Sequence, residues 1–215
     1  QDTKGTPAGA ADAAALAIGD GASLILGPLF SRSVEAVAPP AQAAGVTVIS
    51  FSNDRRVAGG GIFTMGFMPG EQVRSVVSFA FERGIRRFGL LAPDNSYGAT
   101  INSALESIVH ELGAEINGVG VYDPLETDFN TVVKDLANYE VRRQNLLDQR
   151  KALENRKDEI ARKALKRLEN LRTLGDVPFD ALLVAEGGKR LQALAALLPY
   201  YDIDPRKTRI LGTGQ

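Results

Sequence analysis

Residues 24–33 read Leu-Ile-Leu-Gly-Pro-Leu-Phe-Ser-Arg-Ser and contain the end of a strand, a turn and the start of a helix. The uninterrupted apolar run Leu24–Leu26 predicts a strand that is buried on both faces. Gly27 and Pro28 end this strand. Ser31 stands at the expected N-cap of the following helix, where its hydroxyl and the helix-start N–H groups could hold a small carboxylate. A serine that only caps its helix explains the same pattern.

Helices and strands alternate along the rest of the chain, which predicts βαβ units with parallel sheets. We expect helices at 8–19, 31–44 (kinked at Pro39-Pro40), 71–83, 97–112 and 189–198. We expect strands at 23–26, 46–49, 62–65, 87–91, 115–122, 180–184 and 209–211. The glycine-rich segment 54–68 breaks the alternation and indicates a crossing between two α/β lobes. Residues 1–64 then form part of lobe one, 65–208 form lobe two, and 209–215 begin a return toward lobe one.

A charged segment without glycine or proline extends from residue 125 to residue 174. Tyr139, Leu146, Leu153 and Ile160 recur every seven residues, which predicts a long solvated helix or a helical hairpin with a narrow apolar seam. We place this helical arm at 129–174 within lobe two. Residues 140–172 carry 11 Lys or Arg and 6 Asp or Glu, whereas the whole chain has a net charge of -1. Such a segment is either a solvated helix surface or an arm that binds a partner, for which a membrane surface, a peptidoglycan polyanion and a protein all remain open.

The composition excludes several kinds of chemistry. The chain has no cysteine and a single histidine, His110, within a helical pattern, so the usual zinc sites and thiolate catalysis have no ligands. Neither the Gly-x-Ser-x-Gly elbow nor the phosphate- and dinucleotide-binding glycine motifs occur. The net charge gives no indication of nucleic-acid binding, and no apolar run approaches the ~20 residues of a membrane span. We therefore predict a non-enzymatic protein with no catalytic residues, no metal and no cofactor.

Polar residues follow four of the expected strands, where open α/β sheets bind their ligands. They are Ser31 and Ser33; Ser52, Asn53 and Asp54; Tyr97; and Glu186 and Gly187. Two lobes that close on each other would gather these loops around a small polar ligand. In that cleft the hydroxyls would bind a carboxylate, Asp54 or Glu186 an ammonium, and Tyr97 would cover an apolar face. Each loop taken alone is also consistent with ordinary turn chemistry.

Three segments resemble the type I periplasmic binding proteins, and in particular their branched-chain amino-acid receptors. They are Leu-Gly-Pro-Leu-Phe-Ser at 26–31, Gly-Val-Thr-Val-Ile-Ser at 45–50 and Asp-Asn-Ser-Tyr-Gly at 94–98. This resemblance implies two Rossmann-like lobes, in which Ser31 binds the ligand carboxylate, Ser52 makes a backbone-type contact and Tyr97 lies beside the ligand. Asp54 stands where these receptors have a hydroxyl, and Gly187 stands where an aromatic side chain covers the ligand. Both departures count against an ordinary amino-acid ligand.

The arm and the segment Leu-Leu-Pro-Tyr-Tyr-Asp-Ile-Asp at 197–204 narrow the resemblance to the penicillin-binding protein activators. This implies an envelope lipoprotein that regulates peptidoglycan synthesis, with a peptidoglycan synthase bound to the arm. It also implies a periplasmic location and a lipid anchor in the outer membrane that lies outside these residues. The alternative is the solute-binding receptor of an ABC transporter for branched-chain or other amino acids. By the same resemblance we expect a fragment that lacks the first and last strands of the fold.

Overall fold

The computed structural model describes residues 1–156 and 158–214. The chain divides into two compact units, which we call unit 1 (Gln1–Glu71) and unit 2 (from Gln72 onward). The division therefore falls in the first turn of helix α3 (Pro69–Glu82), a few residues beyond the expected lobe boundary at 64/65. Within the part of the chain described here, no helix combines the length and the apolar character that crossing a bilayer requires.

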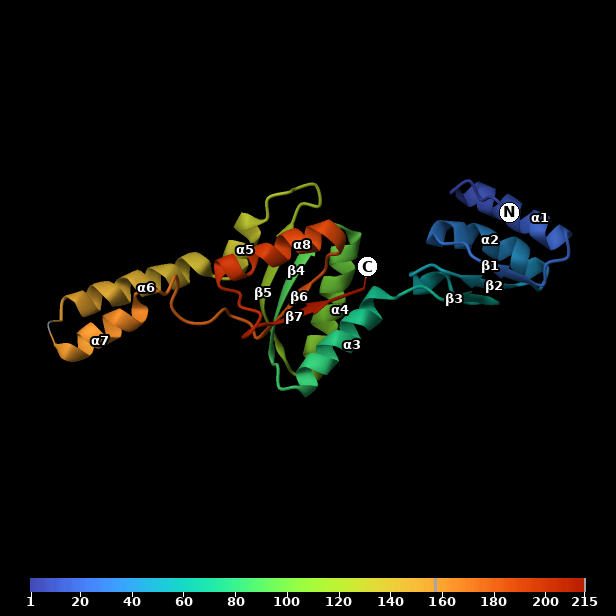
Figure 1. Cartoon of the computed structure of the whole chain (residues 1–215). Helices are drawn as coiled ribbons and strands as arrows, with labels where there is room; N and C mark the ends of the chain where they lie inside the picture. The colour runs from blue at the N-terminus through green and yellow to red at the C-terminus, as the bar shows by residue number, and fades with distance from the viewer. Residues whose placement is uncertain (157, 215) are drawn as a thin grey trace. The chain divides into compact units, whose positions relative to one another are not determined.

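Unit 1 is a three-stranded parallel sheet of order β1-β2-β3, with two helices on one face (Figure 1). Side chains alternate between the two faces of each strand, and those of Ile25, Val48 and Ile62 lie on the face that the helices cover. Together with the helices they form the core of unit 1. Its elements in chain order are α1 (Pro7–Gly19), β1 (Leu24–Leu26), α2 (Ser31–Ala43), β2 (Thr47–Ser50), η1 (Arg55–Val57) and β3 (Ile62–Thr64).

Strand β1 and helix α2 depart from the prediction for residues 24–33. Leu24 and Leu26 are 45% and 67% exposed, because β1 is an edge strand and the helices of unit 1 cover only the face that Ile25 shares. Helix α2 starts at Ser31, the first residue of the expected range, but its N-cap is Phe30 and no side chain caps the helix. Ser31 is thus the first helical residue and not a cap. The helix also continues through Pro39 and Pro40 without interruption.

Unit 2 is a four-stranded parallel sheet of order β5-β4-β6-β7 that lies between two layers of helices (Figure 1). Helices α3 and α4 pack on one face around Phe88 and Leu90, and α5 and α8 pack on the other around Leu91 and Leu182. Its further elements are β4 (Arg87–Pro93), α4 (Ser96–Leu112), β5 (Glu115–Tyr122), α5 (Asn130–Leu136), α6 (Tyr139–Glu154), α7 (Glu159–Leu168), β6 (Ala181–Val184), α8 (Gly188–Leu197), η2 (Pro199–Tyr201) and β7 (Arg209–Gly212).

The last strand corrects the expected return toward lobe one at 209–215. Residues 209–212 form β7, which pairs in parallel with β6 from Ala181↔Arg209 to Val184↔Gly212. This segment therefore belongs to the sheet of unit 2. The apolar pattern of Ile210 and Leu211 is what a strand beside β6 requires, and Leu211 contributes to the core.

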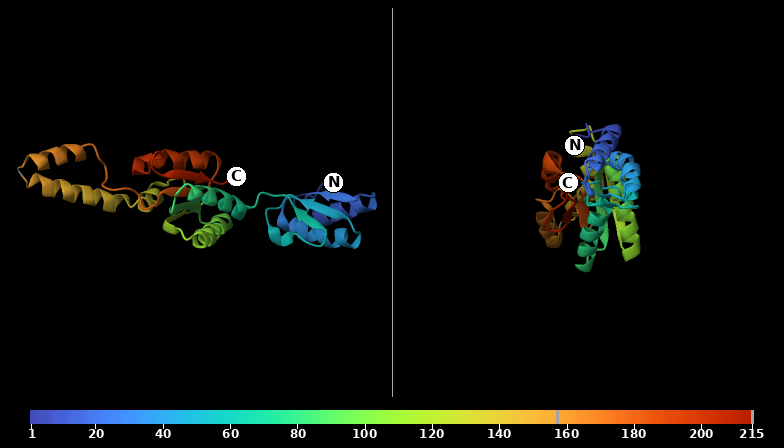
Figure 2. Two further views of the ribbon diagram at one scale, coloured as in Figure 1. Left: turned by 90° about the horizontal axis from the view of Figure 1, so that it is seen from below. Right: turned by 90° about the vertical axis from the view of Figure 1, so that its right-hand side faces the viewer.

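The charged arm is a hairpin of α6 and α7, which lie side by side in two views (Figures 1 and 2). Asp158 begins α7 by accepting a hydrogen bond from the Ala161 amide at 2.9 Å, so the chain turns there. The expected seam ends at this turn, because Leu146 is buried whereas Ile160 is 74% exposed. Residues 129–137 are not part of the arm, since they lie in the core of unit 2.

Candidate functional site

The carboxyl ends of all four strands in unit 2 meet at one edge of the sheet, because every neighbouring pair is parallel. Tyr122 ends β5, Asp94 follows β4, Glu186 follows β6 and Thr213 follows β7. The backbone N–H of Asp94 donates to the carbonyl of Tyr122 at 2.7 Å, which joins the first two of these ends. This edge therefore carries two of the four predicted loops.

Glu186 is the centre of a hydrogen-bonded cluster at this edge. Its Oε2 accepts from the hydroxyl of Tyr122 at 2.7 Å and from Nε of Arg190 at 3.1 Å. Its Oε1 accepts from the N–H of Gly187 at 3.1 Å. The carboxylate is thus neutralised by Arg190 and is only 15% exposed, so it is a weaker ammonium ligand than the sequence suggested. Burial, together with the bond to Glu186, raises the pKa of Tyr122.

Arg190 brings one unused donor to the same cluster. Its Nη1 donates to the carbonyl of Pro124, and its guanidinium lies 5.6 Å from the ring centre of Tyr122 and 5.4 Å from that of Phe129. Its Nη2 is buried and has no acceptor among residues 1–156 and 158–214. A buried N–H without an acceptor is costly, so this atom is suited to bind a carboxylate or a water molecule.

The residues after β4 hold the start of α4. Asn95 caps this helix by accepting from the Gly98 N–H at 3.0 Å. The hydroxyl of Tyr97 lies 2.6 Å from that of Thr213, and its ring packs on the core. Tyr97 therefore joins the loops after β4 and β7, whereas the sequence led us to expect a free ring above a ligand.

The edge of unit 1 carries the serine loops. Gly27 N–H donates to the carbonyl of Ile49 and Phe51 N–H to that of Pro28, so the loops after β1 and β2 lie side by side. Ser31, half-buried, and Ser33, buried, belong to the first loop and helix start. The second loop contains Ser52, which is buried, and Asn53, which is exposed.

Asp54 is held by local contacts in this second loop. Its N–H donates to Oγ of Ser52 at 3.1 Å, and its carboxylate accepts from Nε and Nη2 of Arg56 at 2.9 and 2.7 Å. The hydrogen bond from the Arg56 side chain lowers the pKa of Asp54. Arg56 thus compensates the negative charge that we expected to repel a ligand carboxylate, so the argument against an amino-acid ligand from this position is weakened.

The amino-acid sequence matches a known protein family. A family model described as "Periplasmic binding protein" matches residues 1–141, about two thirds of the chain. The chain belongs to the periplasmic binding protein family. The match ends in the first turn of α6, at the base of the hairpin.

Solved periplasmic binding proteins share the fold of this family member. An ABC-type branched-chain amino acid transporter protein of Rhodopseudomonas palustris has a TM-score of 0.65 at 20% identity, over 100% of this chain and 50% of that one. The branched-chain amino acid substrate-binding protein of Streptococcus pneumoniae, solved in complex with isoleucine, has a TM-score of 0.54 at 18% identity, over 99% and 50%. These are type I periplasmic binding proteins, as the sequence resemblance indicated. The chain spans about half of their length.

A curated relative is an uncharacterised protein of Rickettsia prowazekii. It is 23% identical over 115 residues, which are 54% of this chain and 31% of the relative. The narrower resemblance to the penicillin-binding protein activators stays a prediction.

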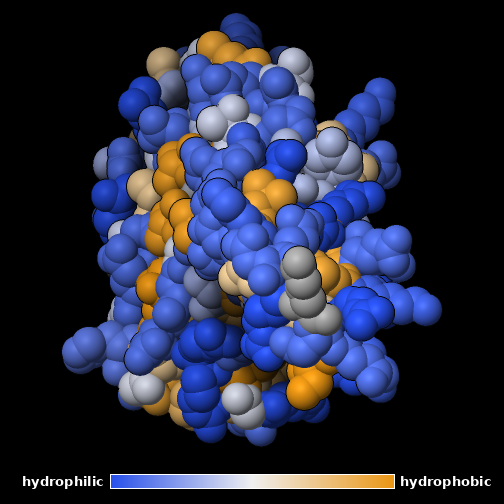
Figure 3. Space-filling view, turned by 90° about the vertical axis from the view of Figure 1, so that its left-hand side faces the viewer, coloured by the Kyte–Doolittle hydropathy of each residue, from blue (hydrophilic) through white to orange (hydrophobic). Residues whose placement is uncertain are grey.

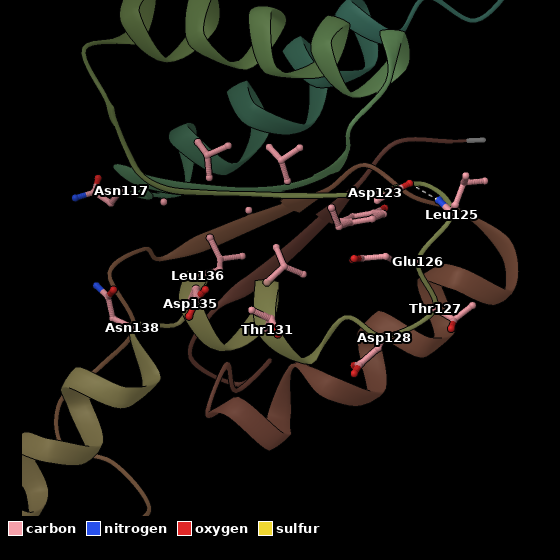
Figure 4. A pocket seen from close by; sticks show the side chains of 16 residues that line it. Asn117, Asp123, Leu125, Glu126, Thr127, Asp128, Thr131, Asp135, Leu136 and Asn138 are labelled. Atoms are coloured by element: carbon pink, nitrogen blue, oxygen red, sulfur yellow. Dashed lines mark hydrogen bonds between the residues drawn. The ribbon is translucent and has the colours of Figure 1, made fainter.

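One cavity of unit 2 was not predicted from the sequence. It encloses about 920 Å³ between β5, the loop 123–128 and α5 (Figure 4). Asp123, Glu126, Asp128 and Asp135 line it, without any lysine or arginine. Asp123 and Asp128 accept from the N–H groups of Leu125 and Asn130, so both carboxylates stabilise the loop itself. No group of side chains within the described ranges is arranged to hold a metal ion.

The residues that sequence reasoning missed are Tyr122, Arg190 and Thr213. The ion pair of Glu186 and Arg190 could have been predicted from the sequence, because the two residues are four positions apart at the start of a helix. The contacts of Tyr122 with Glu186 and of Tyr97 with Thr213 span 64 and 116 residues and have no local signature.

Proposed function

We propose that the chain is a non-enzymatic ligand-recognition domain of a periplasmic solute receptor, with an amino acid as its ligand. The observation that carries this proposal is the family match over residues 1–141. The structural neighbour solved with isoleucine supports the amino-acid class. The family name itself supports a periplasmic location.

The serine-rich edge of unit 1 supports a contact with the ligand carboxylate. Ser31 begins α2, where unpaired helix-start N–H groups and a hydroxyl can bind an anion together. Arg56 offsets the charge of Asp54 in the neighbouring loop. In unit 2, the Nη2 atom of Arg190 offers a separate donor to an anionic group.

Calorimetric titration of the full-length protein with the common amino acids tests this proposal. A hydrogen bond to a charged group contributes about 1.5–3 kcal/mol, so Ser31→Ala should weaken binding about tenfold or more. Ser75→Ala, on the exposed surface of α3, is the matched control and should leave affinity unchanged. Failure of every amino acid to bind the wild-type protein would overturn the proposal.

The hairpin favours a second candidate function, regulation of a peptidoglycan synthase as in the penicillin-binding protein activators. Its support is that nearly all of α6 and all of α7 lie beyond the family match and that residues 140–172 carry a net charge of +5. In this reading the protein is a lipoprotein of the cell envelope.

A shortened hairpin tests the second candidate. Nη2 of Arg150 donates to the carbonyls of Leu168 and Glu169, so residues 151–167 can be replaced by a short Gly-Ser linker between neighbouring ends. This removes the tip while it keeps Arg142 and Leu146, which are both buried. We expect the shortened protein to lose stimulation of a purified synthase and to keep the cooperative thermal unfolding of the wild type, with helix content reduced only by the residues removed. Full stimulation by the shortened protein would contradict this reading.

A further inference from the structure

A cavity of about 410 Å³ lies at the base of the hairpin. It is formed by one face of α6, the segment after α7, and η2. Its lining residues are Tyr139, Arg143, Leu146, Leu147, Arg150, Leu171, Arg172 and Tyr200. The five residues from α6 recur at helical spacing, so they share one side of that helix. None of the predicted ligand-binding residues belongs to this cavity.

The lining is cationic and contains no carboxylate. Nη2 of Arg150 is fixed by the carbonyls that follow α7, and Arg172 lies 5.6 Å from the ring centre of Tyr200. Arg143 is exposed, and its guanidinium has no hydrogen-bond or ion-pair partner within residues 1–156 and 158–214. The nearby carboxylate of Glu140 is paired with Lys134 at 2.6 Å. The hydrogen bond from Lys134 and, to a lesser extent, the charge of Arg143 lower the pKa of Glu140, so this acid offsets part of the positive charge from outside the cavity, whose own lining supplies no carboxylate.

Beneath these charges the cavity has an apolar and aromatic floor. Leu146 is buried, whereas Leu147, Leu171 and Tyr200 are 45%, 44% and 59% exposed. Tyr200 is held edge-on to Tyr201 at 5.1 Å between ring centres, so its exposed face is kept in place. Hydrophilic residues cover most of the hairpin end of the molecule, with hydrophobic residues in separate spots (Figure 3). Exposed tyrosine and arginine around an apolar centre is the composition of interface hot spots.

Elsewhere on the hairpin, two cations are paired with acids of the same segment. Lys163 binds Glu159 at 2.9 Å, and Arg156 binds Asp158 at 2.9 Å. A membrane or a nucleic acid would bind through many cations spread along a surface. Here three arginines line one hollow with an apolar floor, which fits a short peptide better than an extended polyanion.

We propose that this cavity docks an acidic peptide segment of a partner protein, whose carboxylates face Arg143 and Arg172 and whose apolar side chains cover Leu147, Leu171 and Tyr200. Two observations carry this assignment: Arg143 and Arg172 line a cavity that contains no carboxylate, and the cavity has the size of a short peptide segment. It does not depend on the binding of an amino acid by the protein.

Fluorescence anisotropy with a labelled twelve-residue peptide of Glu, Leu and Tyr tests the proposal. Counterparts with Gln or Lys in place of Glu are the probe controls. The Glu peptide should bind the wild-type protein, more weakly as salt rises, and the two counterparts should bind at least tenfold more weakly. Anionic phospholipid vesicles, a single-stranded oligonucleotide and sedimentation of the protein alone test the other occupants.

Charge-reversal variants locate the binding site. The double variant Arg143→Glu, Arg172→Glu should weaken binding of the Glu peptide at least tenfold. Tyr200→Ala should weaken it several-fold without a change of charge. Arg162→Glu, on the exposed surface of α7 outside the cavity, is the matched control and should change affinity less than twofold.

Thermal unfolding and amino-acid titration of the same variants separate this proposal from misfolding and from the proposed receptor function. We expect both to match the wild type. Equal losses in Arg162→Glu and the double variant would overturn the proposal. So would tighter binding of vesicles or the oligonucleotide than of the peptide, or self-association that the double variant abolishes.

Discussion

Arg142 joins the base of the hairpin to the rest of unit 2. Replacing its side chain should therefore loosen the hairpin base. Its side chain is only 8% exposed, although it carries a charge. Nε and Nη2 donate to the carbonyl of Gly175 at 3.2 and 2.8 Å, and Nη1 donates to that of Ala137 at 3.3 Å. Burial lowers the pKa of this guanidinium, so the charge is itself costly. The three hydrogen bonds must outweigh that cost for the contact to stabilise the fold.

The magnitude follows from these opposing terms. Hydrogen bonds from a charged donor contribute about 1.5–3 kcal/mol each, and removal of the charge recovers part of its burial cost. We therefore expect Arg142→Met to destabilise the base of the hairpin by about 2 kcal/mol. Because about 1.36 kcal/mol corresponds to a factor of ten, local opening should become about 30-fold more frequent.

Amide hydrogen exchange reads this opening at one position. The N–H of Leu174 donates to the carbonyl of Arg142 at 3.0 Å, so its exchange reports whether α6 and the returning chain stay joined. The N–H of Val48, in unit 1, serves as an internal reference. Arg143→Met changes the exposed neighbour and should leave the exchange of Leu174 unaltered. If the two variants exchange Leu174 at rates within threefold of each other, the anchoring role of Arg142 is refuted.

Three further predictions concern unit 2. Gly98→Ala should destabilise it by about 3 kcal/mol in urea titration, because a Cβ at this residue would lie 1.9 Å from the backbone oxygen of Pro93. Asn95→Ala should cost about 1 kcal/mol, since it removes the cap of α4. The hydrogen bond from Arg87 lowers the pKa of Asp180 in the folded protein. The ion pair therefore stabilises the folded state fully at pH values above the unfolded pKa of about 3.9. This stabilisation is lost as the pH falls through the lower pKa of the folded state. The pair is partly exposed, so Asp180→Asn should reduce this acid-dependent loss by less than about 1 kcal/mol, which urea titrations at pH 7 and pH 3 measure.

Matched variants keep these predictions specific. Gly19 is the last residue of α1, and a methyl group added there would meet no atom within 4 Å. Gly19→Ala should therefore not destabilise the protein. Asn170→Ala is the control for Asn95→Ala, because it removes an exposed asparagine after α7 that is not a helix cap. Destabilisation by Gly19→Ala as large as that by Gly98→Ala would contradict the steric argument.

Most secondary-structure elements could be predicted from the sequence, because their signals are local. The strand at 115–122 has the expected bounds, and the helix that ends at Leu112 is stopped by Gly113 in the left-handed conformation, as predicted. The errors also have local causes. No residue near Ser31 shows that this serine is the first residue of the helix and not its N-cap. The apolar run Leu24–Leu26 is equally consistent with an edge strand and with a central strand.

The sequence by itself determined the family, the alternation of helices and strands, and the lack of cysteine chemistry. Backbone preferences and apolar periodicity act over a few residues, so they can be read along the chain. Only the tertiary structure decided that the arm is a hairpin, that 209–212 pair with β6 in the sheet of unit 2, and that Tyr122, Glu186 and Arg190 meet. These outcomes depend on the order of strands and on the packing of distant segments, which bring together residues that no short pattern connects.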